Sequence, residues 1–247
     1  MSIFSCMGPK ALNPLEYAVK GFAPDKLDTW PDLRLDFWFL ASEALRGELK
    51  DLQGSLAVLC SRSEEQPLEK WETDCLREAL MVHKQHLKAE MVKDERLEQL
   101  LKQRILLGDM MQNDPRVLES WERFEVVFKK ATIVHIEQAF LKYHDLLLKQ
   151  LEHRESSALM LARAYFAPEE LRPLLNEVLE GPACLVGSLI HYASDQGFAS
   201  LMRREEISSL SWYCSLKGKR NEFQQSFVRR IAAMNCGLNP SSCGLCA

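Results

Sequence analysis

The chain has 247 residues, of which 47% are hydrophobic and 27% are charged, so it can bury a sizeable core and wholesale disorder is excluded. Its formal net charge of -4 disfavours a protein whose main task is to coat nucleic acid, because neutralising phosphates requires a surplus of Lys and Arg. The 11 Gly and 10 Pro are too few turn residues for an all-β chain of this length. We therefore predict an all-α protein.

The cysteines and the apolar runs indicate in which cellular compartment the protein is expected. The eight cysteines are irregularly spaced and several lie in apolar helical stretches, which is typical of reduced thiols and not of a secreted disulfide framework. The first ten residues lack a signal-peptide pattern, and no apolar run approaches the roughly 20 residues that span a bilayer. We expect a cytoplasmic protein without a membrane span.

The first long helix follows two short elements, which we expect at residues 13–21 and 24–30. It is predicted over residues 32–60, where leucines at spacings of three and four form the stripe of a helix with one buried face. Phe37, Trp38 and Phe39 cover three successive directions around this helix, so one face cannot bury all of them. We favour burial in the protein's own core, and the alternative is a sticky patch that binds a partner.

A second long helix is predicted to begin at Pro67 and to end near residue 107. Most of its surface is densely charged, so we expect much of it to face solvent. His83 and His86 lie one turn apart and could share a metal ion, but no third ligand is evident within a turn. We therefore interpret them as two solvated histidines.

The third long helix has the clearest start in the chain, an Asp114 N-cap followed by Pro115. It is predicted to run to about residue 165, with a bend near residues 155–157. His135 lies on its predicted apolar stripe, and we interpret it as a core histidine bonded to a neighbour. The alternative is that His135 serves as a base or a ligand in a buried pocket.

Shorter helices are predicted after residue 167. One ends at Gly181, an apolar one covers residues 183–196 and contains His191, and two more cover residues 205–216 and 220–235, the last closed by Gly237. The predicted organisation is a long-helix region with an aromatic N-terminal segment (1–166), a compact helical cluster (167–236) and a flexible Cys-containing tail (237–247). One continuous domain is the alternative.

The tail contains the sharpest local motif, a CxxC pair formed by Cys243 and Cys246, with Cys236 seven residues earlier. Thiolates at this spacing can bind Zn²⁺ or act as a redox dithiol. No second pair completes four ligands, so we expect no resident cofactor and keep zinc at these three cysteines as the alternative.

Residues 199–247 carry seven basic and three acidic side chains, a net of +4 on a chain whose total is -4. This segment could contact an acidic partner or nucleic acid, or associate head to tail with the acidic remainder of another copy. A solvated rim around buried aromatic residues is the interpretation we favour. The basic candidates for partner binding are Arg203, Arg204, Lys219, Arg220, Arg229 and Arg230.

The sequence contains no Glu-x-x-His, no His-Glu-x-x-His, no Gly-x-Ser-x-Gly and no glycine-rich phosphate loop. The leading hypothesis is therefore a non-catalytic helical adaptor or scaffold that acts through protein–protein contacts in a larger assembly. One alternative is a ligand-binding helical protein or enzyme with a pocket near His135 and His191. Another is a nucleic-acid-binding regulator that uses the basic C-terminal helices.

Overall fold

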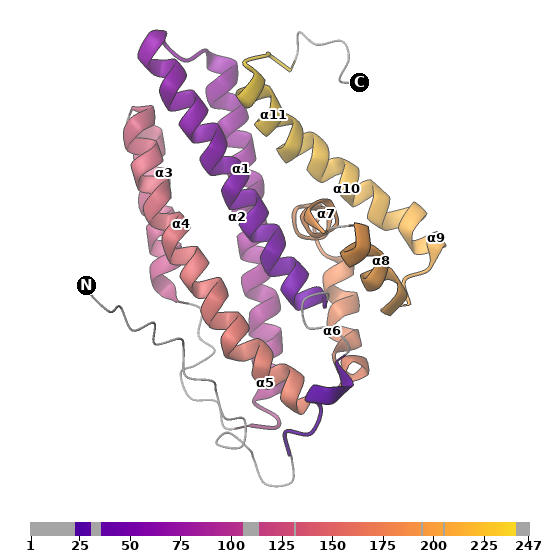
Figure 1. The fold of residues 1–247 in the computed structure, drawn as a ribbon. Coiled ribbons are helices and arrows are strands. Elements are labelled where there is room, and N and C mark those ends of the chain that lie inside the picture. Colours follow the sequence, from indigo (N-terminus) through magenta and orange to yellow (C-terminus); the bar gives the residue numbers. More distant parts are fainter. Residues whose placement is uncertain are drawn as a thin grey trace, which may run out of the picture.

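The computed structural model describes residues 23–30, 36–105, 114–130, 132–193, 195–204 and 206–240. The regular elements in these ranges are helices, which confirms the all-α prediction. The long helices lie side by side over much of the molecule (Figure 1). They are α1 (Phe37–Glu65), α2 (Lys70–Leu101), α3 (Pro115–Lys130), α4 (Ile133–Ser156) and α5 (Ala158–Tyr165).

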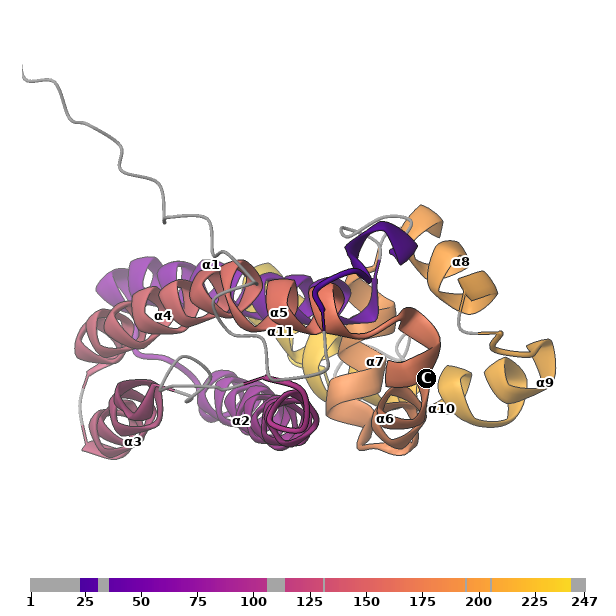
Figure 2. The same cartoon turned by 90° about the horizontal axis from the view of Figure 1, so that it is seen from below.

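The second half of the chain lies along one side of these helices (Figures 1 and 2), and its last helix packs on α1 and α2. It begins with α6 (Pro168–Glu180), α7 (Ala183–Tyr192) and α8 (Asp195–Arg204). A continuous helical run follows, made of α9 (Ser209–Ser211), the π-helical η4 (Trp212–Leu216), α10 (Lys217–Phe223), the π-helical η5 (Gln224–Val228) and α11 (Arg229–Cys236). Near the other end of the chain, η2 (Leu27–Thr29) is a short 3-10 helix.

This C-terminal run corrects the prediction of two helices over residues 205–216 and 220–235. The run is continuous because its buried residues, among them Leu216, Phe223 and Ile231, keep one face against the core across the expected break. It ends where predicted, at Gly237, whose φ of 66° forms a left-handed C-cap.

Local capping explains where the long helices begin. The Asp36 carboxylate accepts a hydrogen bond from the Phe39 N–H at 2.7 Å, so α1 starts at Phe37, and the residues immediately before Asp36 lie outside the described ranges. Glu69 and Glu72 form a capping box, and α2 therefore starts at Lys70 instead of at Pro67. The Asp114–Pro115 start is confirmed for α3.

The predicted third helix is not continuous. It divides into α3 and α4, which pack side by side, and the break resets the helical phase. Ile136 and Phe140 are buried as a result, while His135, expected in the core, is exposed. A second break, at Ser157, separates α4 from α5 at the predicted bend. The helix predicted over residues 183–196 also ends earlier, because α7 stops at Tyr192.

The core has two apolar clusters, and α1 contributes to both. Near the start of α1, Phe37 and Ala41 pack with residues of α5, α6 and α7. Further along, Leu49 and Leu56 pack with residues of α2, α4 and the C-terminal run. The two halves of the chain therefore share one central helix. None of the described helices combines the length and the apolar character that crossing a bilayer requires.

A close crossing of α7 and α10 places α6 beside the C-terminal run. A Cβ at Gly187 would lie 2.4 Å from the carbonyl oxygen of Lys219, so the two backbones can approach only where this side chain is absent. The Lys219 ammonium donates to the carbonyls of Leu179 and Gly181 at 2.7 and 2.8 Å. It thereby satisfies carbonyls at the end of α6 and ties α6 to α10.

Candidate functional site

A polar stripe on α2 faces the interior of the molecule. His83, His86, Glu90, Lys93 and Asp94 recur every three or four residues, and all five are buried. Our prediction that His83 and His86 are solvated is therefore wrong. The physical reason is that α1 and α4 supply complementary polar groups opposite the stripe, which compensate for the loss of water.

Glu48 from α1 lies at the centre of one end of this network. Its two carboxylate oxygens accept hydrogen bonds from Nδ1 of His83 and Nδ1 of His86, each at 2.6 Å. Nε2 of His83 lies 2.7 Å from the hydroxyl of Tyr143 on α4. Burial alone would raise the pKa of Glu48, but the charge of His86 and the hydrogen bonds from both imidazoles outweigh burial and lower this pKa to about 2. Glu48 is therefore an ionised carboxylate in the core.

Arg154 from α4 contacts the polar groups at the other end of this network. Its Nη1 lies 2.9 Å from Glu90 and 2.9 Å from the nearer oxygen of Asp94, and its Nη2 contacts the Ser42 hydroxyl of α1. Lys93 Nζ approaches Glu90 at 2.5 Å. Burial would raise the pKa of Glu90, yet Lys93, His86 and Arg154 hold it well below the usual value. Burial does raise the pKa of Asp94, despite its contact with Arg154.

His86 links the two ends. Its Nδ1 donates to Glu48, while its Nε2 lies 3.8 Å from a carboxylate oxygen of Glu90. Burial opposes the charged imidazole, but the Glu48 carboxylate and, next, Glu90 raise the pKa of His86 to about 9. The acidic side chains of Glu48, Glu90 and Asp94 therefore lie among the basic side chains of His86, Lys93 and Arg154, three acidic groups against three basic ones. Burial lowers the pKa of Lys93, although Glu90 opposes this shift.

The raised pKa of His86 predicts a loss of stability in alkaline solution. The stabilising contribution is fully present below the unfolded value of 6.5 and is lost as the pH rises through about 9. From pH 6.5 to pH 9.5, we expect this one group to lower the free energy of unfolding by up to about 3 kcal/mol. Denaturant titrations at several pH values should show this slope in the wild type and a smaller one in His86→Gln. The exposed His135→Gln should keep the wild-type slope.

The network is closed to solvent, which limits the chemistry that it can perform. Glu48, His83 and His86 each have 0% of their surface exposed. Trp121 from α3 packs against this end, with its ring centroid 5.6 Å from that of His83 and 4.9 Å from that of Tyr143. Within the described residues no group of three or more His, Cys, Asp or Glu is arranged to hold a metal ion. We interpret the network as a device that fixes the register of α1, α2 and α4.

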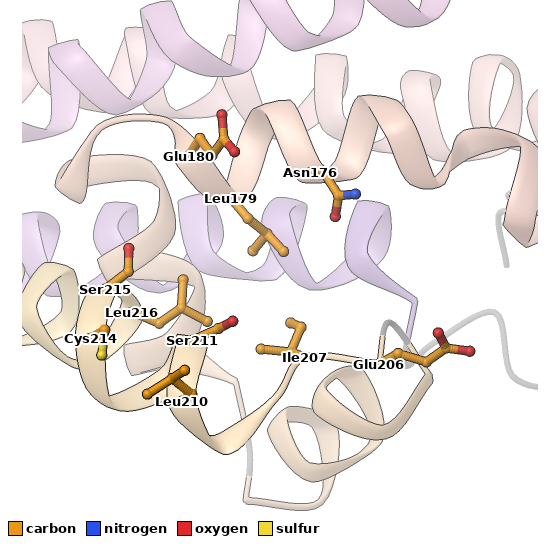
Figure 3. A pocket seen from close by; sticks show the side chains of 10 residues that line it. All are labelled: Asn176, Leu179, Glu180, Glu206, Ile207, Leu210, Ser211, Cys214, Ser215 and Leu216. Carbon is orange, nitrogen blue, oxygen red and sulfur yellow. The ribbon is translucent and has the colours of Figure 1, made fainter.

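An open site lies elsewhere, between α6 and the start of the C-terminal run. We call it the α6 cleft, and its volume is about 570 Å³. Leu179 projects from α6 toward Ile207 and Leu216 on the opposite wall (Figure 3). The residues that line it are Asn176, Leu179, Glu180, Glu206, Ile207, Leu210, Ser211, Cys214, Ser215 and Leu216.

Two large apolar side chains stand exposed at this cleft. Leu210, which lines it, is 72% exposed, and Tyr213, one turn further along, is 67% exposed. On the preceding connection, Glu206 has a φ of 53°, a left-handed conformation that is costly for a residue with a side chain. The chain thus holds a strained turn and two exposed apolar groups at the same surface, a combination that is more typical of a contact surface than of a solvated helix end.

The aromatic residues at the start of α1, for which we favoured burial over a partner-binding patch, are mostly internal. Phe37 and Trp38 are buried in the core and pack on each other edge to face, and Lys93 Nζ lies 5.5 and 5.2 Å from their ring centroids. Phe39 is half-buried. The side chains of Phe37 and Trp38 therefore offer little surface to a partner, because they lie in an apolar cluster with residues of α2, α5, α6 and α7.

The basic residues predicted to bind a partner are spread over α8, α10 and α11. Lys219 is engaged in capping α6, and Arg230 pairs with Glu78 of α2 at 2.6 Å. Arg203 and Arg229 are exposed, whereas Arg204 and Arg220 are half-buried. Part of the predicted basic surface therefore serves internal packing.

The remaining candidates do not converge on one site. His135 is exposed at the start of α4, where it bonds the Thr132 hydroxyl at 2.8 Å, and His191 is half-buried at the end of α7 against Phe223. These elements lie at different ends of the molecule (Figure 2), so the two histidines do not share a pocket. Cys236 is exposed, and Cys243 and Cys246 lie outside the described residues.

Comparison of the chain with protein-family models, curated proteins and solved structures gave no match.

Proposed function

We propose that this chain is a non-catalytic helical adaptor or scaffold that binds protein partners at the α6 cleft. The observation that carries the proposal is the exposure of Leu210 and Tyr213 beside an open cleft with an apolar floor. Large apolar and aromatic side chains of this kind commonly supply most of the binding energy of a protein interface. The buried histidines and acids, by contrast, have no surface through which a substrate could reach them.

The lining of the cleft indicates the chemistry of the partner. Leu179, Ile207 and Leu216 form an apolar floor, and the exposed Glu180 lies at its rim. An apolar side chain of the partner would fill the floor, and a Lys or Arg beside it would face Glu180. Nucleic acid is a poorer fit, because the floor is apolar and its rim is acidic.

The proposal can be tested by site-specific photo-crosslinking. A photoreactive amino acid would replace Leu210 in one variant and, as a matched control, the similarly exposed Val92 of α2 in another. We expect a defined crosslinked protein from position 210 and not from position 92 in cells that produce the chain. The crosslinked protein, once identified and purified, should bind Leu210→Lys at least tenfold more weakly than the wild type, while Val92→Lys should bind like the wild type.

Two results would reject the proposal. One is a chain that forms no crosslink from position 210 to any protein. The other is a crosslinked protein whose affinity does not change when Leu210 is replaced. Circular dichroism should show that Leu210→Lys keeps its helix content, since this exposed side chain contributes little to the core.

A further inference from the structure

A second groove lies at the opposite end of the molecule, along the seam of α3 and α4. Both views place this helix pair at one end and the α6–α8–α9 region at the other (Figures 1 and 2). The groove has a volume of about 570 Å³, and Val127 of α3 and Ala139 and Leu146 of α4 are partly exposed along it. We call it the α3–α4 groove.

Three cationic side chains line the rims of this groove, together with the exposed Glu119 of α3. Arg116 and Arg123 extend from α3 and Lys142 from α4, and all three are exposed. Arg116 is held by Asp114 at 2.6 Å, whereas Arg123 has only a long contact of 3.5 Å with Glu119. Arg123 and Lys142 are therefore the groove cations best placed to meet an external carboxylate.

The α6 cleft presents the opposite charge. Glu177 and Glu180 are exposed on α6, and Glu206 is exposed on the facing connection, where Arg172 approaches it at 3.4 Å. Leu210, which lines the cleft together with Glu180 and Glu206, is exposed, and so is Tyr213 one turn further along, where Lys217 Nζ lies 5.6 Å from its ring centroid. An acidic rim with protruding apolar side chains at one end is thus matched by a cationic rim with an apolar floor at the other.

We infer that this chain associates head to tail, with Leu210 and Tyr213 of one copy seated in the α3–α4 groove of a second copy. The inference rests on the proposed function and names a second copy as the partner of the α6 cleft region. Glu177 and Glu180 of the first copy would face Arg123 and Lys142 of the second. The two surfaces are different and lie at opposite ends, so each copy would keep one free end and the contact would build an open row of copies.

Charge reversal tests the inference with this chain alone. One variant combines Glu177→Lys with Glu180→Lys, and another combines Arg123→Glu with Lys142→Glu. The exposed pair Asp145→Lys and Lys149→Glu on α4, outside the groove lining, is the control. Sedimentation at low salt should show a wild-type average mass that rises above 28.4 kDa with concentration. Each reversal variant should need at least tenfold more protein to associate, and the control variant should behave like the wild type.

Mixing the two reversal variants provides the decisive measurement. The mixture should regain association, because each variant keeps one original surface that matches the original surface of the other. A wild type that stays monomeric at several hundred micromolar, reversal variants that associate normally, or a mixture that does not regain association would each overturn the inference. If self-association fails, the proposed function can still hold, because the crosslinking test at Leu210 can identify a different protein as the partner.

Discussion

Replacing Glu48 with Gln should lower the free energy of unfolding by about 3–5 kcal/mol, the range typical when one partner of a buried ion pair is removed. Glu48 accepts from two imidazoles, one through each carboxylate oxygen, and all three side chains are fully buried. The amide of Gln keeps the shape but offers only one oxygen, so one histidine must change tautomer to avoid two donors facing each other. The charged form of His86 also loses its nearest anion, which adds to the loss.

Chemical denaturation followed by circular dichroism would measure this effect. Glu43→Gln is the matched control, because Glu43 lies on the same helix and pairs with Arg46 at 2.7 Å, but its side chain is 44% exposed. We expect the control to change the free energy of unfolding by about 0.5 kcal/mol or less. Equal denaturation midpoints for Glu48→Gln and the wild type would show that Glu48 does not hold the network together.

Glu48→Gln should also abolish much of the alkaline slope that we attribute to His86. Without the Glu48 carboxylate, the folded pKa of His86 moves down toward its unfolded value, so less proton binding is linked to folding. The stability of this variant should therefore depend less on pH between 6.5 and 9.5 than that of the wild type. Glu48→Gln and His86→Gln each remove one partner of the Glu48–His86 contact, so both variants test the same interaction.

The helical architecture could be predicted from the sequence because it depends on local signals. The spacing of the leucines in α1, the Asp114–Pro115 start and the Gly237 end each act within a few residues of the element that they define. The break between α3 and α4 was missed for the opposite reason. Residues 115–156 carry a nearly continuous helical pattern, and the turn is favoured by the tertiary packing of the two helices on each other.

The buried network could not be predicted because the acidic and basic groups that contact one another in it lie far apart in the sequence. The three- and four-residue spacing of His83, His86 and Glu90 is visible in the sequence, but the same spacing describes a solvated face. Only the fold brings Glu48 from 35 residues away and Arg154 from 64 residues away into contact with this stripe. A polar stripe beside a leucine stripe can therefore be a solvated face or part of a buried network. Which of the two forms depends on whether other helices supply complementary polar groups.

The aromatic segment was predicted in part. We favoured burial of Phe37, Trp38 and Phe39 in the core and kept a partner-binding patch as the alternative, because one helix face cannot bury three directions. The start of α1 lies in an apolar cluster with residues of α2, α5, α6 and α7, so Phe37 and Trp38 are buried, and Phe39 is half-buried. The surface candidates Leu210 and Tyr213 were missed because isolated apolar residues at a helix start do not stand out in a sequence with many of them.

Replacing Arg154 with Met should have an effect of similar size, about 3–5 kcal/mol, because it takes from Asp94 its nearest cation and from Glu90 one of its cations. Arg154 bonds Glu90 and Asp94 and reaches the hydroxyl of Ser42, so it joins α4 to both α1 and α2. The loss should shrink at lower pH. Burial already raises the pKa of Asp94, and in the variant Asp94 can take up a proton more readily and so become neutral.

A compensating variant separates a charge effect from a packing effect. Arg154→Met combined with Asp94→Leu removes one acidic and one basic group and leaves Glu48 and Glu90 with His86 and Lys93, two acidic groups against two basic ones. We expect this pair to regain at least half of the stability lost in Arg154→Met, because a buried ion pair can often be replaced by apolar groups of similar volume. The exposed Arg77→Met, which removes a surface pair with Asp74, should change stability by about 0.5 kcal/mol or less. If the double variant were less stable than Arg154→Met alone, Arg154 would act through its packing and its bond to Ser42, and the balance of buried charge would not be what orders these three helices.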